Sequence, residues 1–200
     1  MRYKVVIILI LLFIITGCSQ KTTPLEAYRN LKENRIASKI NLSLITNPLL
    51  VDKTYKFDLK ISDSLIIYGN DEKIYANYKD FNIDLKSNKK YKIKISSLCD
   101  CFGFTKYMFI PLVSVLNQNG MTMKLESQPD TFDYSHGPLS LNKTWILENL
   151  TNNNSKIIVS SNNVNLGQDL YKFFTYPIPM TINIKTSLVG KFNITIEEIK

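Results

Sequence analysis

Apolar and polar residues alternate with a period of two along much of the chain. In residues 55–61, Tyr, Phe, Leu and Ile occupy every second position, with Lys and Asp between them. Because successive side chains of a β-strand point to opposite faces of a sheet, this alternation predicts half-buried antiparallel strands. The same pattern recurs at residues 81–85, 91–96, 182–185 and 192–197.

Four more apolar segments are predicted to be strands, and turn-forming residues separate them. These segments are residues 107–116, 121–125, 141–147 and 156–160. Asn119-Gly120 is the strongest hairpin signal, because type I′ turns favour this pair. Residues 186–190 are expected to close a second hairpin. Residues 169–174 are expected to form one or two helical turns, which the prolines that follow them stop.

About ten short strands with little helix predict a mostly β fold. We expect one domain over residues 24–200, which is an antiparallel β-sandwich of Ig-like or jelly-roll-like type, or a small barrel. A short helix is expected at its start, over residues 24–34. There Thr23 can cap the helix, Pro24 suits the first turn and Glu26 completes a capping box.

The first eighteen residues carry the pattern of a bacterial lipoprotein signal. Arg2 and Lys4 precede an unbroken apolar run over residues 5–15. Its eleven residues would rise only about 16 Å as a helix, which is too short for the roughly 30 Å of a bilayer core but fits a secretory signal peptide. Residues 15–18, Ile-Thr-Gly-Cys, resemble a lipobox, whose cysteine is acylated and becomes the first mature residue.

A lipobox predicts cleavage after residue 17, lipidation of Cys18, and a short lipidated tether over residues 18–23. The acyl chains would hold the protein on a membrane, because each buried CH₂ contributes about 0.8 kcal/mol. Ser19 resembles the second mature residue of lipoproteins sent to the outer membrane, so we expect a cell-envelope protein that faces the periplasm. An uncleaved membrane anchor and an ordinary signal peptide with an incidental cysteine are the alternatives.

Cys99 and Cys101 are candidates for a disulfide, because an exported protein meets oxidising conditions. On an extended strand their Cα atoms would lie about 6.6 Å apart, at the edge of disulfide range, so a bond here needs a turn or strain. Two unpaired thiols, a redox or metal pair, and a bond to another chain are the alternatives. Two thiolates and one Asp make an incomplete zinc site, and we expect no metal and no cofactor.

Enzymatic chemistry has one candidate. His136 is the single histidine, and it follows Asp133 and Ser135 in a loop. These residue types suit a hydrolase, but catalytic triads assemble from distant positions on rigid elements, and the sequence has no Gly-x-Ser-x-Gly elbow. A polar loop is the simpler interpretation, and we expect no catalytic residues.

The formal net charge of +8 comes mostly from lysine, since the chain has 22 Lys and 3 Arg. Five lysines cluster around one turn and strand: Lys86, Lys89, Lys90, Lys92 and Lys94. A nucleic-acid groove would mix Arg with exposed aromatic side chains, so we expect no nucleic-acid partner. We expect instead a solvated face or a protected edge strand. Attraction to anionic lipid or polysaccharide is the functional alternative.

Several aromatic residues are candidates for a surface that stacks on sugar rings. Aromatic faces pair well with the apolar CH face of a pyranose. Core packing is the competing role for each of them, including Tyr107. The candidate ligand-binding residues are Trp145, Tyr134, Phe132 and His136.

The middle of the chain resembles a known family. The segments that carry the resemblance are residues 81–85 (FNIDL), 91–97 (YKIKISS), 109–117 (FIPLVSVLN), 132–134, 137–139, 157–161 and 190–194. Their order and spacing resemble the maltose operon periplasmic protein family, which has a similar strand ending in a serine pair, a Pro followed by a Val-Leu-Asp run, and an aromatic-x-Tyr loop. The resemblance implies an exported protein linked to carbohydrate transport, and it transfers no catalytic residues. The lipobox and the cysteine pair depart from that family.

These observations predict a non-enzymatic, membrane-anchored module that binds a carbohydrate or another envelope protein. The alternative is a lipid or lipoprotein carrier with a hydrophobic half-barrel, because residues 176–184 resemble the end of outer-membrane lipoprotein receptors. This alternative requires a large apolar cavity. A hydrolase that uses His136 is the third hypothesis.

Overall fold

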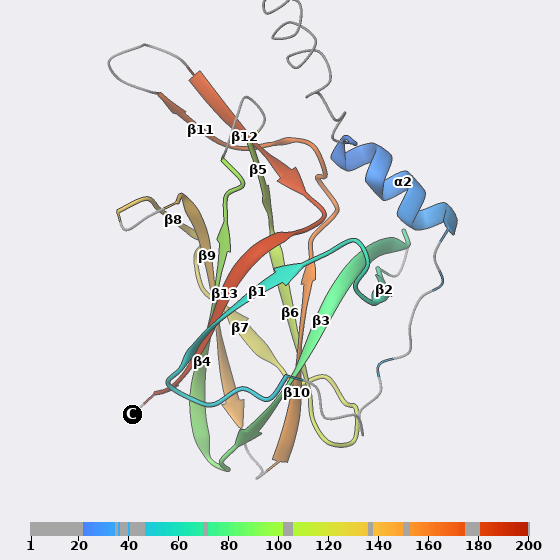
Figure 1. Ribbon diagram of the computed structural model, residues 1–200. Coiled ribbons are helices and arrows are strands. Elements are labelled where there is room, and N and C mark those ends of the chain that lie inside the picture. Colours follow the sequence, from blue (N-terminus) through green and yellow to red (C-terminus); the bar gives the residue numbers. More distant parts are fainter. Residues whose placement is uncertain are drawn as a thin grey trace, which may run out of the picture.

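Two large β-sheets and one smaller sheet make up the fold. The computed structural model describes residues 22–34, 36, 40, 47–69, 72–101, 106–135, 138–149, 153–174 and 181–199. Thirteen strands and one helix occupy these residues. The large sheets face one another in an elongated body, and the smaller sheet extends beyond one end of it (Figure 1). The predicted β-sandwich with a short N-terminal helix is confirmed.

Helix α2, Pro24–Asn34, precedes the strands and begins as the sequence predicts. The Thr23 backbone N–H donates to Glu26 Oε2 at 2.9 Å, and the Glu26 N–H donates to Thr23 Oγ1 at 3.3 Å. These reciprocal bonds form a capping box. Ala27 and Leu31 are four residues apart on one helix face and are both buried. That face packs on a small apolar cluster: Leu65, Leu166 and Leu188.

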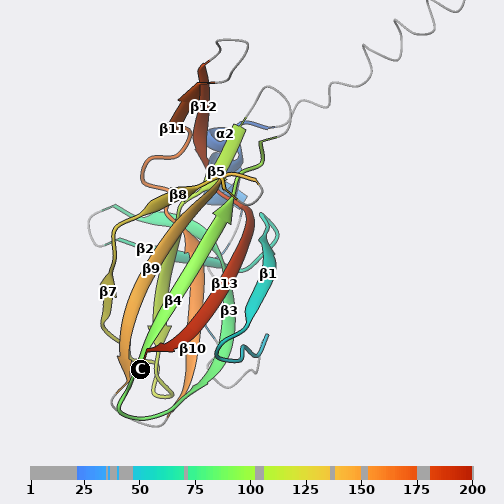
Figure 2. The ribbon, with the colours of Figure 1, turned by 90° about the vertical axis from the view of Figure 1, so that its left-hand side faces the viewer.

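The first large sheet has six strands in the order β1-β13-β4-β9-β7, with β8 also paired to β9. Their bounds are β1 Thr54–Leu59, β4 Lys89–Leu98, β7 Leu125–Ser127, β8 Thr131–Asp133, β9 Ser140–Asn149 and β13 Gly190–Ile199. All pairs in this sheet are antiparallel. Figure 2 shows the sheet facing the viewer, with β4 between β13 and β9. Every second side chain of β4 from Tyr91 to Ser97 is buried, as the alternation predicts.

The second large sheet has the order β2-β3-β10-β6, and the third sheet has the order β11-β12-β5. Their bounds are β2 Leu65–Tyr68, β3 Ile74–Leu85, β5 Lys106–Phe109, β6 Pro111–Leu116, β10 Asn153–Ser161, β11 Asp169–Phe174 and β12 Thr181–Ser187. Strands β5 and β12 run parallel, whereas the other pairs are antiparallel. The β11–β12 pair projects away from the sandwich (Figures 1 and 2).

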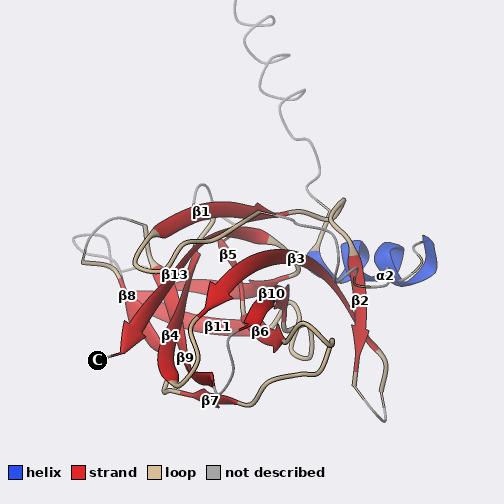
Figure 3. Ribbon diagram, turned by 90° about the horizontal axis from the view of Figure 1, so that it is seen from below, coloured by secondary structure: helices blue, strands red, loops and turns tan. Residues whose placement is uncertain are grey.

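Side chains from both large sheets fill the space between them. Figure 3 shows the two layers from below, and the core lies where they face each other. Phe81 of β3 and Phe192 of β13 are fully buried. Their ring centroids are 6.3 Å apart, and Phe192 also lies 5.8 Å from both Phe57 and Phe109. Such tilted and edge-on contacts add to the stabilisation from burial, so this region is a packed core.

Buried asparagines hold loops against the sheets. Asn149 is fully buried and donates from Nδ2 to the carbonyls of Leu85 and Lys86, at 3.2 and 2.9 Å, in the turn between β3 and β4. Asn163, just after β10, donates to the carbonyl of Tyr75 at 2.7 Å. Because a buried amide N–H must find an acceptor, each asparagine favours one conformation of its loop.

Two predicted strands differ in the structure. Residues 107–116 form two strands, β5 and β6, which belong to different sheets and meet at Ile110. Pro111 begins β6, and a residue without an N–H suits a change of sheet at this point. Residues 121–125 do not form a strand, because β7 starts only at Leu125. The turn predicted at Asn119-Gly120 is present, with Gly120 at φ +78°.

Two predictions for the C-terminal region are wrong. Residues 186–190 do not close a hairpin, because β12 pairs with β11 and β5 whereas β13 pairs with β1 and β4. Residues 188–189 therefore carry the chain from one sheet to another. Residues 169–174 form strand β11 instead of helical turns, because they pair with β12 in an antiparallel register. Long-range pairing here overrides the local pattern.

Candidate functional site

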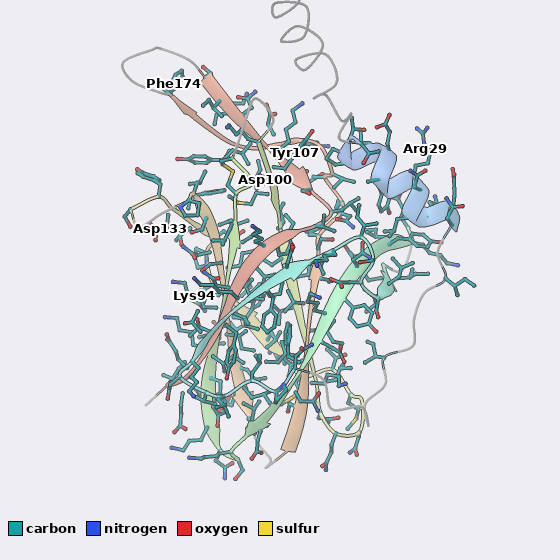
Figure 4. The ribbon with its side chains drawn as sticks, in the orientation of Figure 1. Arg29, Lys94, Asp100, Tyr107, Asp133 and Phe174 are labelled. Atoms are coloured by element: carbon teal, nitrogen blue, oxygen red, sulfur yellow. A yellow bond between two sulfur atoms is a disulfide. The ribbon has the colours of Figure 1, made fainter. Side chains whose placement is uncertain are left out.

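An open groove of about 980 Å³ lies at the end of the sandwich where β1 and β4 end and β13 begins. Four separate parts of the chain form its wall: the start of α2, the turn after β1, the end of β4 with β5, and the β12–β13 connection. Its lining consists of residues 58–62, 98–100 and 187–191, with Thr22, Pro24, Ala27 and Tyr107. Figure 4 labels Asp100 and Tyr107 in this region. The volume is within the usual range of ligand sites.

The floor of the groove is apolar. Leu59 and Leu188 are 1% and 2% exposed, and Ala27 and Cys99 are also buried. Ile61, at the rim, keeps 43% of its surface exposed. Leu98 and Val189 also line the groove and are half-buried. Because an apolar ligand would remove the exposed surface of these side chains and of Ile61 from water, the groove favours apolar ligands.

Charged residues around the groove do not favour one sign. Asp58 and Asp100 contribute two negative charges, and Lys60 and Lys191 contribute two positive charges. These formal charges cancel, so the local field does not select anionic or cationic ligands. The apolar floor is therefore the main chemical property of the groove.

A buried asparagine fixes the rim turn that carries Ile61. Asn77 of β3 is fully buried, and its Nδ2 donates to the carbonyls of Ile61 and Asp63, each at 2.9 Å. Asp63 in turn accepts from the Lys60 N–H at 2.8 Å and from Lys79 Nζ at 3.0 Å. These contacts hold the turn against β3, so the position of Ile61 is set before any ligand binds.

The disulfide between Cys99 and Cys101 lies at the wall of the groove. The two Cα atoms are 5.1 Å apart, which is closer than on an extended strand, so the chain turns at Asp100 as a bond here requires. Asp100 and Tyr107 exchange backbone hydrogen bonds of 2.8 and 3.2 Å, and the Cys99 N–H donates to the Leu139 carbonyl at 2.8 Å. The end of β4 is thereby tied to its neighbours.

The start of the described domain is part of the same wall. Thr22 and Pro24 line the groove, and the capping box fixes the backbone between them. Hydrogen bonds from the Thr23 backbone and then from its hydroxyl lower the pKa of Glu26, so its carboxylate is ionised at neutral pH. Cys18, the predicted lipidation site, lies outside the described residues.

The structure does not bring together the three candidate ligand-binding residues that it describes. Trp145 is 7% exposed and belongs to the inter-sheet core, so core packing is the role that the structure gives it. Phe132 stacks on Tyr171, with ring centroids 4.4 Å apart. Tyr134 is 73% exposed, and His136 lies outside the described residues. No shared stacking surface is formed by Trp145 with Phe132 or Tyr134, the candidates that the structure describes.

The loop before His136 is held by local bonds. The Ser135 N–H and hydroxyl both donate to Asp133 Oδ1, at 2.8 and 2.6 Å. This is a turn closed by an aspartate side chain, as in many polar loops. Among the described residues, no group of three or more His, Cys, Asp or Glu side chains could hold a metal ion. Within the same part of the chain, no helix has the length and apolar character needed to span a bilayer.

The clustered lysines lie on a solvated face and not at an edge. Strand β4 has partners on both sides, so the edge-strand alternative is wrong. Lys89 Nζ lies 2.7 Å from Glu198 Oε1, and Lys92 Nζ lies 3.8 Å from Glu197 Oε2. The hydrogen bond from Glu198 raises the pKa of Lys89. Exposed ion pairs of this kind contribute little to stability.

Sequence patterns did not reveal the groove. Leu59 and Ile61 belong to the alternating run of residues 55–61, but that pattern predicts a strand and not a groove. The other apolar side chains come mostly from strand ends and from the turns between strands. One usable signal was Leu188-Val189, an apolar pair between two strands at a position where turns are usually polar. Asn77 carries no such signal, because its role depends on burial against a distant turn.

Comparisons with known proteins do not assign this site, because no family model, curated protein or solved structure matches the chain. The resemblance to the maltose operon periplasmic protein family stays a prediction. The class of protein that the fold and the groove define is a β-sandwich with an apolar groove beside its N-terminal helix.

Proposed function

We propose that the protein is a membrane-anchored envelope lipoprotein that acts as a non-enzymatic binding module, with the groove as its ligand site. The observation that carries this proposal is the position of the groove. Thr22 and Pro24 line it, and the lipobox Cys18 precedes Thr22 by only four residues. Four Cα steps span at most about 14 Å. A lipid on Cys18 would therefore keep the groove next to the bilayer, which we propose to be the outer membrane on its periplasmic side.

The lining favours an apolar segment of another envelope protein over a carbohydrate. A carbohydrate site combines aromatic stacking faces with several directed polar groups. The floor here is aliphatic, with Leu59 and Leu188 at its base. A protein partner that inserts one or two large apolar side chains would match this floor and leave its polar groups at the charged rim.

A lipid or lipoprotein carrier with a hydrophobic half-barrel is the alternative hypothesis, and it requires a large apolar cavity between curved sheets. In the described part of the chain, side chains such as Phe81 and Phe192 fill the space between the large sheets. This packed core argues against a half-barrel carrier and favours the binding module.

Anchoring is tested by feeding cells an alkyne analogue of palmitate and comparing the wild type with Cys18→Ala. The expected result is label and membrane association that both depend on Cys18. Label that persists in Cys18→Ala, or wild-type protein without label, contradicts the lipoprotein proposal.

Binding is tested with purified lipidated protein in envelope pull-downs and on glycan arrays. Ile61→Asp places a charge at the groove rim, and Ile67→Asp is the matched control, since Ile67 is 38% exposed on β2 and does not line the groove. We expect Ile61→Asp to reduce recovery of the wild-type partner at least tenfold and Ile67→Asp to leave it unchanged. Empty results in both assays, or equal binding by both variants, contradict the proposal.

A further inference from the structure

We propose that the groove holds a fatty acyl chain of the protein's own lipidated Cys18 whenever that acyl chain is outside a bilayer. This inference rests on the proposed lipidation of Cys18, and it adds a second ligand class to the groove and names the source of that ligand. The occupant is a saturated hydrocarbon chain supplied by the same molecule.

The tether between Cys18 and the groove is short enough for the acyl chain to reach the groove. Cys18 lies within about 14 Å of Thr22 even along a fully extended backbone, and Thr22 is itself part of the groove lining. The capping box fixes the chain at Thr23, so the tether starts from a defined point at the groove. A ligand on so short a tether has an effective concentration in the millimolar range, and even weak affinity is then sufficient to fill the groove.

The groove also matches an acyl chain chemically. A hydrocarbon chain has no charge and no hydrogen-bonding groups, and the groove offers apolar side chains at its rim and wall: the exposed Ile61 and the half-buried Leu98 and Val189. The charges at the rim cancel. The hydroxyl of Ser187, which also lines the groove, is already bonded within its turn, since it donates to the Val189 carbonyl at 2.9 Å and accepts from the Val189 N–H at 3.3 Å. Burying a methylene chain beside it therefore does not strip that hydroxyl of its partners.

The acyl chain gains from entering the groove only when it is outside a bilayer. In a bilayer the acyl chains are already away from water, so the groove offers no advantage. Outside a bilayer, entry into the groove is the way for the tethered chain to leave water without aggregation. A protein destined for the outer membrane passes through an aqueous compartment, and this is the stage at which the site acts. The acyl chain and a protein partner would then exclude each other, which confines partner binding to the anchored form.

The test uses full-length lipidated protein labelled in cells with a palmitate analogue that carries both an alkyne and a diazirine. The alkyne reports whether Cys18 is acylated, and the diazirine forms a bond to whatever the acyl chain touches on irradiation. Detergent is removed before irradiation, and the bonded peptides are identified by mass spectrometry. Wild type, Ile61→Asp and the control Ile67→Asp are compared.

We expect bonds within the same chain, at residues 59–62 and 187–191, that fall at least fivefold in Ile61→Asp and persist in Ile67→Asp. Alkyne signal on Cys18 with bonds only elsewhere, or only between chains, overturns the inference but leaves the lipoprotein proposal intact. Absence of alkyne signal from wild-type Cys18 overturns the proposed lipidation, and this inference with it.

Discussion

The inter-sheet core and the groove are both apolar, but they differ in how far their apolar side chains are enclosed by the rest of the chain. In the core, Phe81 and Phe192 are fully enclosed by side chains of the same chain. Beneath the groove, Leu59 and Leu188 are enclosed in the same way, whereas Ile61 stays 43% exposed at the rim. Enclosed apolar side chains stabilise the fold, and we propose that the open apolar rim of the groove binds a ligand. Substitutions in the core should therefore change stability, and substitutions in the groove should change binding.

The largest effect is expected from Phe192→Ala in the core. Phe192 contacts the rings of Phe57, Phe81 and Phe109, so its loss leaves a cavity between the sheets. The free energy of unfolding should fall by about 3–5 kcal/mol, as measured by urea denaturation. Phe174→Ala is the control, because Phe174 is 81% exposed, and it should change stability by less than about 0.5 kcal/mol. Equal effects of the two variants would remove the distinction between enclosed and open apolar surface.

Asn77→Ala should have the next largest effect, because it links the core to the groove rim. The carbonyls of Ile61 and Asp63 would lose their donor, which should cost about 1–3 kcal/mol. Amide exchange in residues 60–63 should also speed up. Asn183→Ala is the control, because Asn183 is exposed on β12. A stable variant with unchanged exchange at the rim would show that Asn77 does not fix this turn.

Removal of the disulfide should reduce stability less than Phe192→Ala and no more than the middle of the range given for Asn77→Ala. Cys99 and Cys101 are two residues apart, so the bond closes a very short loop and constrains the unfolded chain little. The double variant Cys99→Ala with Cys101→Ala should lose about 1.5 kcal/mol on the loop-entropy account. Reduction of the wild-type protein by dithiothreitol should give a similar loss. A loss above about 4 kcal/mol would mean that the bond organises the groove end as a whole.

The smallest effect concerns alkaline pH. Burial raises the pKa of Tyr68, whose hydroxyl donates to the Ser161 carbonyl at 2.9 Å. In the unfolded chain this phenol ionises near pH 10. As pH rises above about 10, the unfolded state loses the proton first, so the free energy of unfolding falls until the folded pKa is passed.

The decrease of the unfolding free energy with pH should become shallower in Tyr68→Phe than in the wild type. The unfolding free energy of Tyr68→Phe should still fall somewhat with rising pH, since burial and the charge of Asp80 also raise the pKa of Tyr78. Denaturation measured between pH 9 and 11 distinguishes these outcomes. If the unfolding free energy depends on pH identically in the wild type and in Tyr68→Phe, Tyr68 is not a source of this pH dependence.

The sequence predicted those features that depend on local order. The capping box of Thr23 and Glu26 and the alternation in β4 both follow from neighbouring residues. The sequence did not predict which strands pair with each other. A period of two shows which side chains of a strand are buried, but it does not show which strand lies alongside. Residues 107–116 therefore looked like one strand, although Pro111 divides them between two sheets. Strand β2, Leu65–Tyr68, is a similar case, since the alternation did not mark it.

The groove could not be predicted for the same physical reason. Its floor is assembled from chain segments far apart in sequence, around Leu59, Cys99 and Leu188. Each segment alone resembles an ordinary strand end or turn. The aromatic residues offered a simpler sequence signal, but Trp145 proved to be a core residue. Cys18 is the part of the functional account that depends on sequence alone.

We propose that the groove is an apolar ligand site that the acyl chain of Cys18 fills when the protein is outside a membrane. Hydrogen–deuterium exchange tests this most directly, with lipidated wild type and unlipidated Cys18→Ala compared in the absence of detergent and bilayer. Exchange in residues 59–62 and 187–191 should be at least tenfold faster in Cys18→Ala, while β10 stays unchanged. Identical exchange of these groove residues in the two proteins would contradict the account.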